Sequence, residues 1–264
     1  MRWYTGNPVY DSLLLAGFIF AGLIFLSSKF GTAKYGGRFG APNKGIKVSA
    51  KQGWILMELP ALVVFPIVFF MGSKAMAPVP LLLLAIWTMH YLNRALITPL
   101  LIRTQPGSKS SFDISVILLG WLTLTLHSYL NARYITELGD HYTIGWLRDP
   151  RFILGLLIYL AGFILNVQSD SILRNLRSRH PKPDEPRYKI PFGGGFRFVT
   201  CPQYLGEIIA FTGWAIMTWN LGAVFVVAIT VANLIPRAQY THRWFKKNFE
   251  DYPSERKAIF PFLL

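Results

Sequence analysis

The chain has 264 residues, of which 52% are hydrophobic and only 15% are charged, well below the roughly 25% of a typical soluble domain. Its single cysteine, Cys201, excludes an intramolecular disulfide framework and a four-cysteine zinc site. A net charge of +14 is typical of nucleic-acid-binding proteins, but here the basic residues lie in short linkers between long apolar runs. That distribution records orientation in a membrane, so we expect an integral membrane protein with no nucleic-acid partner.

Seven apolar segments qualify as membrane spans, since a bilayer core is crossed by about 17–25 mostly apolar residues per helix. In chain order they are residues 12–28, 54–72, 79–102, 113–131, 152–167, 203–219 and 221–235. The last two are nearly fused, which predicts a tight helical hairpin. We therefore predict an all-α polytopic membrane protein, a bundle of seven transmembrane helices forming a single domain over residues 1–264.

Lysine and arginine are distributed unequally between the linkers of this seven-span chain. One side carries 21 of the 27 basic residues, in segments 29–53, 103–112, 168–202 and the tail from 237. The other side carries five, and Arg94 lies within the third span. The first apolar segment is preceded by Asp11 and followed by Lys29, the reverse of a cleavable signal peptide. The positive-inside rule then predicts an N-terminus outside and a C-terminus in the cytosol.

Ionisable groups lie inside the predicted spans, where each is costly and usually functional. Glu58 lies near the start of the second span. The middle of the third span carries four polar residues within five positions, His90, Tyr91, Asn93 and Arg94. A buried arginine needs an anionic partner, so we interpret these groups as lining an internal cavity. An interfacial Glu58 and a purely structural hydrogen-bond cluster remain alternatives. For the whole chain, a channel, a scaffold or an assembly factor is the alternative, but a scaffold would have little use for such groups.

A polar stripe begins in the fifth span and continues beyond it. At 100° per residue, Asn166, Asp170, Arg174 and Arg177 fall within an arc of about 80°. The order of amide, carboxylate and two guanidiniums suits a long ligand with a polar head and a phosphate-bearing tail, because arginine binds phosphate bidentately. A solvated juxtamembrane helix is the alternative, and it explains the arginines better than it explains Asn166.

The linker 178–202 is rich in proline and glycine, and Tyr188 is followed there by three consecutive glycines at 193–195. Such a run can approach phosphates closely. It neither follows a strand, as a dinucleotide fingerprint does, nor ends in Lys-Ser/Thr, as a P-loop does. Gln203 and Glu207 come next, four residues apart at the start of the sixth span. The histidines of the tail lack the spacing of metal ligands, so we expect no metal.

These motifs together resemble the steroid 5α-reductase family, and the chain looks like a bacterial homologue of the mammalian enzyme. The most specific motifs are Asp170-Ser-Ile-Leu-Arg-Asn-Leu-Arg177, Tyr188-Lys-Ile-Pro-Phe-Gly-Gly, Tyr204-Leu-Gly-Glu207 and Phe249-Glu-Asp-Tyr-Pro-Ser-Glu-Arg-Lys. The resemblance extends to Tyr35-Gly-Gly-Arg, Glu58-Leu-Pro and His90-Tyr91, and so covers most of the chain.

The resemblance implies that the bundle holds NADPH within the membrane domain, closed by cytosolic loops. Residues 1–150, with spans one to four, would carry the substrate-side residues, and residues 151–264 most of the cofactor residues. Glu58 and Tyr91 would lie at the 3-keto group of a steroid. By motif position, the cofactor would be held by Tyr35, Arg94, Arg103, Asn166, Asp170, Arg177, Tyr188, Gln203, Glu207 and Arg237.

The implied reaction is reduction of the C4–C5 double bond of a 3-oxo-Δ4 steroid, or of a similar enone. Tyr91, supported by Glu58, would donate a hydrogen bond to the ketone oxygen and stabilise the enolate that develops. Hydride from NADPH would reach C5, and C4 would take a proton. The apolar substrate would enter from the bilayer between helices. We expect a monomer in contact with membrane lipid, in a bacterial inner membrane or, in a eukaryote, the endoplasmic reticulum.

Several positions depart from the family pattern. Met57 stands where the family has Gln, Gln203 where it has Asn, and Phe245 where it has Tyr, while Tyr240-Thr241-His242 replaces a run of three His. We expect the cofactor site to survive these changes with altered contacts.

Other functions remain compatible with the residues. A reductase could act on a different apolar conjugated lipid. A membrane methyltransferase of the isoprenylcysteine type would use S-adenosylmethionine, which has no phosphates and leaves the arginine stripe less to bind. A non-enzymatic sterol-binding protein is the third alternative.

Overall fold

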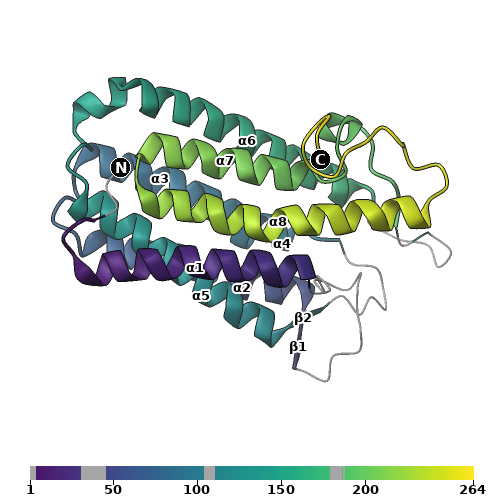
Figure 1. Cartoon of the computed structure of the whole chain (residues 1–264), viewed down its shortest axis with the longest axis horizontal. Helices are drawn as coiled ribbons and strands as arrows, with labels where there is room; N and C mark the ends of the chain where they lie inside the picture. The colour runs from purple at the N-terminus through teal and green to yellow at the C-terminus, as the bar shows by residue number, and fades with distance from the viewer. Residues whose placement is uncertain (1–3, 31–45, 104–110, 179–185, 187) are drawn as a thin grey trace.

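The computed structural model describes residues 4–30, 46–103, 111–178, 186 and 188–264, which form a bundle of long helices lying side by side (Figure 1). The helices are α1 (Pro8–Phe30), α2 (Ala50–Phe70), α3 (Pro78–Leu92), α4 (Thr98–Leu100), α5 (Ile114–Arg133), α6 (Pro150–Asn175), α7 (Pro202–Thr218) and α8 (Leu221–Asn248). Two π-helical turns, η1 (Asn93–Ile97) and η2 (Tyr134–Leu138), extend α3 and α5, and η3 (Ile144–Arg148) and η4 (Gly194–Arg197) are 3-10 turns.

Each of the seven expected apolar segments coincides with a helix, α3, η1 and α4 together forming the third. Within the described residues, six helices are long and apolar enough to cross a membrane. The exception is α7, which has 17 residues and packs against α6 and α8. Residues 219–220 alone separate α7 from α8, as the predicted hairpin requires. The start of α1 and the C-terminal segment lie at opposite ends of the bundle (Figure 1).

Two helices extend beyond the boundaries drawn from hydropathy. The expected fifth span ends at residue 167, whereas α6 continues to Asn175, and the expected seventh ends at 235, whereas α8 continues to Asn248. Backbone hydrogen bonding continues after the apolar residues end, so hydropathy underestimates the length of the helix. The linkers also form a small antiparallel pair that an all-α prediction omits, β1 (Lys47–Ser49) with β2 (Ser111–Asp113).

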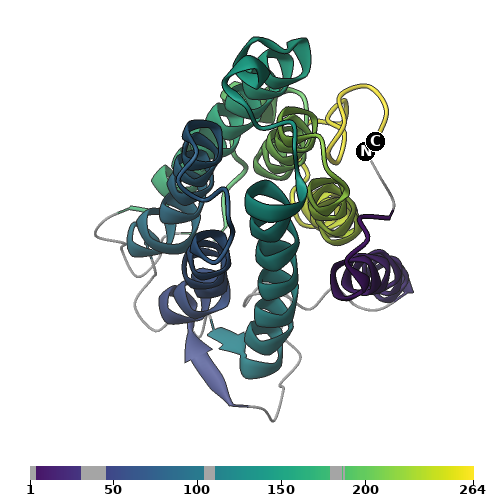
Figure 2. The same cartoon turned by 90° about the vertical axis from the view of Figure 1, so that its left-hand side faces the viewer.

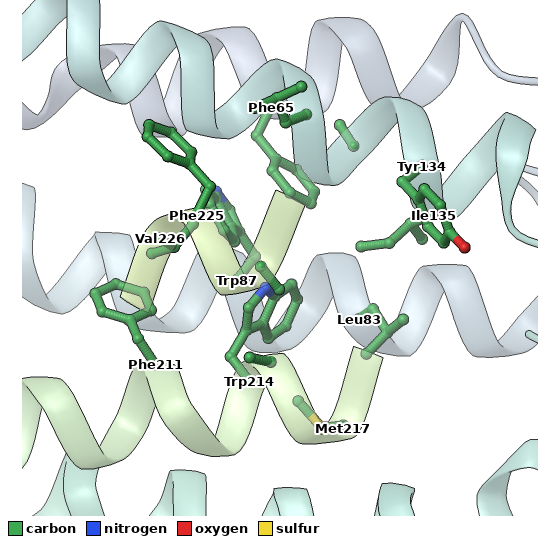
Figure 3. Packing of buried hydrophobic residues seen from close by; sticks show 14 of the residues in the cluster. Phe65, Leu83, Trp87, Tyr134, Ile135, Phe211, Trp214, Met217, Phe225 and Val226 are labelled. Carbon is green, nitrogen blue, oxygen red and sulfur yellow. The ribbon is translucent and has the colours of Figure 1, made fainter. Parts of the chain in front are cut away.

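Aromatic side chains fill the centre of the bundle (Figure 3). Trp87 stacks on Phe65 with ring centroids 4.2 Å apart and donates its indole N–H to the carbonyl of Ala61. Trp214 donates to the amide oxygen of Asn131 at 2.9 Å. Each buried indole therefore has the partner that its polar atom requires. Seen end-on, α1 lies at the edge of the bundle beside α8 (Figure 2).

Glycines bring α6 and α7 into direct backbone contact. A Cβ placed on Gly155 or Gly162 of α6, or on Gly206 or Gly213 of α7, would lie within 3.0 Å of backbone atoms of the other helix. Small residues at a helix interface permit this close approach. The spacing of seven residues within each helix keeps both glycines on the same face.

Candidate functional site

A cavity of about 630 Å³ lies between the helices and is lined by polar and apolar residues. Every predicted site residue in the described part of the chain lines it, and Tyr35 lies outside the described residues. The lining thus includes both predicted catalytic residues and the predicted cofactor residues, Glu58, Tyr91, Arg94, Arg103, Asn166, Asp170, Arg177, Tyr188, Gln203, Glu207 and Arg237.

One wall of the cavity carries a cluster of charges centred on the half-buried Arg94, with two buried carboxylates beside it. Its Nε lies 3.1 Å from an oxygen of Glu58 and 3.4 Å from an oxygen of Glu207. Glu58 comes from α2 and Glu207 from α7, so the guanidinium joins three elements distant in sequence. His90 Nε2 lies 3.7 Å from Glu207. Arg94 therefore has two anionic partners, the carboxylates of Glu58 and Glu207.

Tyr91 contacts a residue that the sequence analysis did not single out. Its hydroxyl oxygen lies 2.7 Å from Nε2 of His127, and both side chains are buried. Glu58, expected to support Tyr91, instead accepts a hydrogen bond from Arg94. The expected Tyr91–Glu58 pair is thus two neighbouring groups, each with its own partner. In the sequence, His127 is a histidine within the apolar fourth predicted span, 113–131, and this could have marked it as a candidate site residue.

Asn166 ties α6 to α7 at the cavity wall. Its side-chain amide donates to Glu207 Oε2 and to the backbone carbonyl of Gln203, both at 2.9 Å. The side-chain oxygen of Gln203 is buried and has no hydrogen-bond partner among the described residues. A buried amide oxygen in a cavity wall is available to a donor on a bound ligand.

Basic side chains gather where α4 and α6 end. Arg103 donates to the backbone carbonyl of Arg177 at 2.9 Å, and Arg177 donates to that of Arg103 at 2.8 Å. Arg174, Lys189 and Arg237 line the same cavity. The predicted stripe of α6 therefore faces the cavity along its length, from Asn166 to Arg177.

The glycine run 193–195 does not belong to the cavity lining. Gly193 and Gly194 have positive φ, 87° and 49°, which favours glycine. A Cβ on Gly195 would lie 2.6 Å from Pro202. The glycines therefore serve a tight turn and close packing. From this linker, Pro186, Tyr188 and Lys189 reach the cavity instead.

Hydrogen bonds hold the C-terminal segment, after α8, against the linker between α6 and α7. The hydroxyl of Thr200 lies 2.6 Å from His242 Nδ1 and 2.7 Å from the hydroxyl of Tyr252. Arg256 donates to the carbonyl of Pro191 at 2.9 Å. Burial raises the pKa of Tyr252, which keeps its hydroxyl neutral at physiological pH.

Four of the positions that depart from the family pattern also line the cavity, namely Met57, Gln203, Thr241 and Phe245. Met57 packs over Gly120 of α5 so closely that a Cβ there would collide with its side chain. The wall beside Glu58 therefore presents a thioether at this point.

Comparison with known proteins gives consistent matches over most of the chain. A family model described as 3-oxo-5-alpha-steroid 4-dehydrogenase matches residues 110–264. "Steroid 5-alpha-reductase DET2" of Solanum lycopersicum is 36% identical over 240 residues, which is 90% of this chain and 91% of the relative. "3-oxo-5-alpha-steroid 4-dehydrogenase 1" of Mus musculus is 36% identical over 259 residues, 97% of this chain and 95% of the relative. The protein of the same name from Homo sapiens is 36% identical over 230 residues, 86% and 85% respectively.

Proposed function

Because the chain belongs to the steroid 5α-reductase family, a family of oxidoreductases, we propose that it reduces the C4–C5 double bond of a 3-oxo-Δ4 steroid, or of a similar enone, with NADPH. The observation that carries the proposal is a single cavity with a phenol and a carboxylate at one wall and gathered guanidiniums at another. The relatives' names supply the substrate class. The described residues that line the cavity all come from one chain, as a monomer requires.

We also propose that all seven helices span the membrane, with the N-terminus outside and the C-terminus in the cytosol. The supporting observations are the 21 to five distribution of basic residues and the opposite ends at which α1 begins and the C-terminal segment lies. In this arrangement α7 is a short span enclosed by protein, which explains why so much of it is buried.

The lining of the cavity fits NADPH. Five arginines and Lys189 line it against the three carboxylates of Glu58, Asp170 and Glu207, and this excess of positive charge suits an anionic ligand. Arg103 and Arg177, held at one junction, would repel each other less with a phosphate between them. The unpartnered oxygen of Gln203 suits an amide or hydroxyl donor. When bound, NADPH supplies the hydride for the reduction.

Tyr91 acts on the ketone of the substrate. Its hydroxyl donates a hydrogen bond to the carbonyl oxygen, which polarises the conjugated system and stabilises negative charge as it develops there. Glu58 lies on the same wall, and its carboxylate keeps the guanidinium of Arg94 in place. The buried position of both groups excludes water, so their electrostatic effect is stronger than in solution.

The test is to supply detergent-solubilised protein with a panel of enones and to measure their reduction through the oxidation of NADPH. Tyr91→Phe and Glu58→Gln should fold and bind NADPH, yet lose about a hundred- to a thousandfold in rate. The double variant measures whether the two groups act together: a loss no larger than that of either single variant would show that they do, and losses that multiply would show that they act separately.

Tyr142→Phe is the matched control for the loss of a buried phenol hydroxyl. The hydroxyl of Tyr142 donates to the carbonyl of Thr218, outside the cavity lining. This variant should lose stability without losing kcat. A Tyr91→Phe protein with near-normal kcat would remove the proposed mechanism, and S-adenosylmethionine binding in place of NADPH binding would remove the proposed function.

A further inference from the structure

His127 and Tyr91 form a buried hydrogen bond between α5 and α3. Nε2 of His127 lies 2.7 Å from the hydroxyl oxygen of Tyr91, and the two residues are 3% and 1% exposed. Both line the cavity. The other ring nitrogen, Nδ1, is buried and has no hydrogen-bond partner within the described part of the chain.

The direction of this hydrogen bond decides what Tyr91 can offer a substrate. A phenol hydroxyl has one proton to donate and lone pairs that accept. A ketone oxygen only accepts. If Tyr91 donated its proton to His127, it would have no proton left for the ketone. If His127 donates to the phenol oxygen, the phenol proton remains available.

The surroundings of His127 favour the second arrangement. A neutral imidazole carries its proton on one nitrogen only. With the proton on Nδ1, the ring would bury an unpaired N–H among aromatic side chains, with the Trp87 ring 5.2 Å away and the Phe211 ring 6.4 Å away. Buried unpaired N–H groups are rarer than buried unpaired acceptors. The proton therefore belongs on Nε2, the nitrogen that faces Tyr91.

We propose that His127 is a positioning residue for Tyr91, whose Nε2–H donates to the phenol oxygen and leaves the phenol proton directed at the substrate's ketone. The inference rests on the proposed function for the identity of that acceptor. No proton moves between the two side chains. Accepting a hydrogen bond also makes the phenol a better donor, because hydrogen bonds in a chain polarise one another.

Three substitutions separate this role from packing. Gln places its amide nitrogen near the position of Nε2, Asn places its own near Nδ1, and Leu supplies no donor. His127→Leu and His127→Asn should lower kcat roughly tenfold with little change in KM, as the loss of one net hydrogen bond predicts. His127→Gln should restore most of that loss. In a Tyr91→Phe background, all three should have no further effect on kcat.

A second measurement does not depend on turnover. With 3-fluorotyrosine incorporated at position 91, the ¹⁹F resonance should move in His127→Leu and His127→Asn and return toward the original position in His127→Gln. If the ¹⁹F pattern holds while the wild type reduces no enone, the positioning role stands and the proposed function fails. If enones are reduced but neither kcat nor the resonance responds to His127→Leu, or if Gln behaves like Asn, the positioning role is wrong.

Discussion

A methyl group added at Gly206 should damage both stability and cofactor binding. In the native bundle, Gly206 of α7 lies against the backbone of α6. The Cβ of an alanine there would lie 2.6 Å from the backbone nitrogen of Asn166 and 2.7 Å from the carbonyl oxygen of Gly162, whereas ordinary contact begins at 3.4 Å. Backbone atoms cannot rotate away as a side chain does, so the two helices must separate.

The shortfall in distance sets the size of the effect. Relieving it requires a separation approaching 0.8 Å, the difference between 3.4 and 2.6 Å. The hydrogen bond from Asn166 to Glu207, now 2.9 Å long, would then exceed the length at which such bonds form. Overpacking typically costs about 1–3 kcal/mol, and the better helix propensity of alanine offsets about 1 kcal/mol. A net loss of about 1 kcal/mol lowers Tm by about 2–4 °C.

Gly22→Ala is the matched control, because nothing lies within 4 Å of a Cβ at Gly22 of α1. Thermal unfolding in detergent should show a lower Tm for Gly206→Ala and an unchanged or slightly higher Tm for Gly22→Ala. Titration with NADPH should show affinity weakened roughly tenfold or more only in Gly206→Ala, since a buried amide loses its partner. Equal Tm values for the two variants would refute the argument from helix contact.

Three further outcomes are expected. Arg177→Ala should raise KM for NADPH more than for NADH with less change in kcat, because phosphate contacts stabilise the bound ground state and the transition state equally. Arg148→Ala, outside the cavity lining, is the control. Unchanged KM values for both cofactors would contradict the phosphate role of Arg177. Burial lowers the pKa of His141 below the ordinary histidine pKa of about 6.5. The free energy of unfolding should therefore be constant above about pH 6.5 and fall below it, because the unfolded chain then binds a proton that the folded chain resists. A melting series that is flat from pH 7 to pH 5, or a pH dependence unchanged by His141→Gln, would contradict this. Reporter fusions at the two termini should locate them on opposite sides of the membrane, and both on one side would exclude seven spans.

Much of the bundle could be predicted from local patterns. Seven apolar runs correspond to seven helices because the length of a span follows from the thickness of a bilayer. The stripe from Asn166 to Arg177 faces the cavity because helix periodicity fixes which residues share a face. The ends of the helices were harder to predict from the sequence, since α8 continues through Pro236 and polar residues to Asn248. Hydropathy records where lipid ends, and the hydrogen-bonded helix does not end there.

Contacts between helices distant in sequence could not be predicted. The partner of Tyr91 is 36 residues away on another helix, and no spacing rule relates the two. The glycines of α6 and α7 were visible as pairs seven apart, but only the packed structure shows that each meets backbone. The run 193–195 shows how little a local pattern can decide, because its positive φ values and its packing against Pro202 are visible only in the folded chain.

The π-helical turn η1 makes the length of the third span part of the site. A π-turn is in effect one extra residue within an α-helix, and η1 lies between Tyr91 and Arg103 and contains Arg94. If residues 93–97 were rewound as a regular α-helix with the same number of residues, everything after them would rotate by about 100° relative to Tyr91. Arg103 would then turn away from Arg177. Deleting one residue from 95–97 removes the extra residue and keeps Arg103 on its present face, whereas inserting one does not. The segment should therefore tolerate a single-residue deletion better than a single-residue insertion, and a library of such length variants would locate the turn.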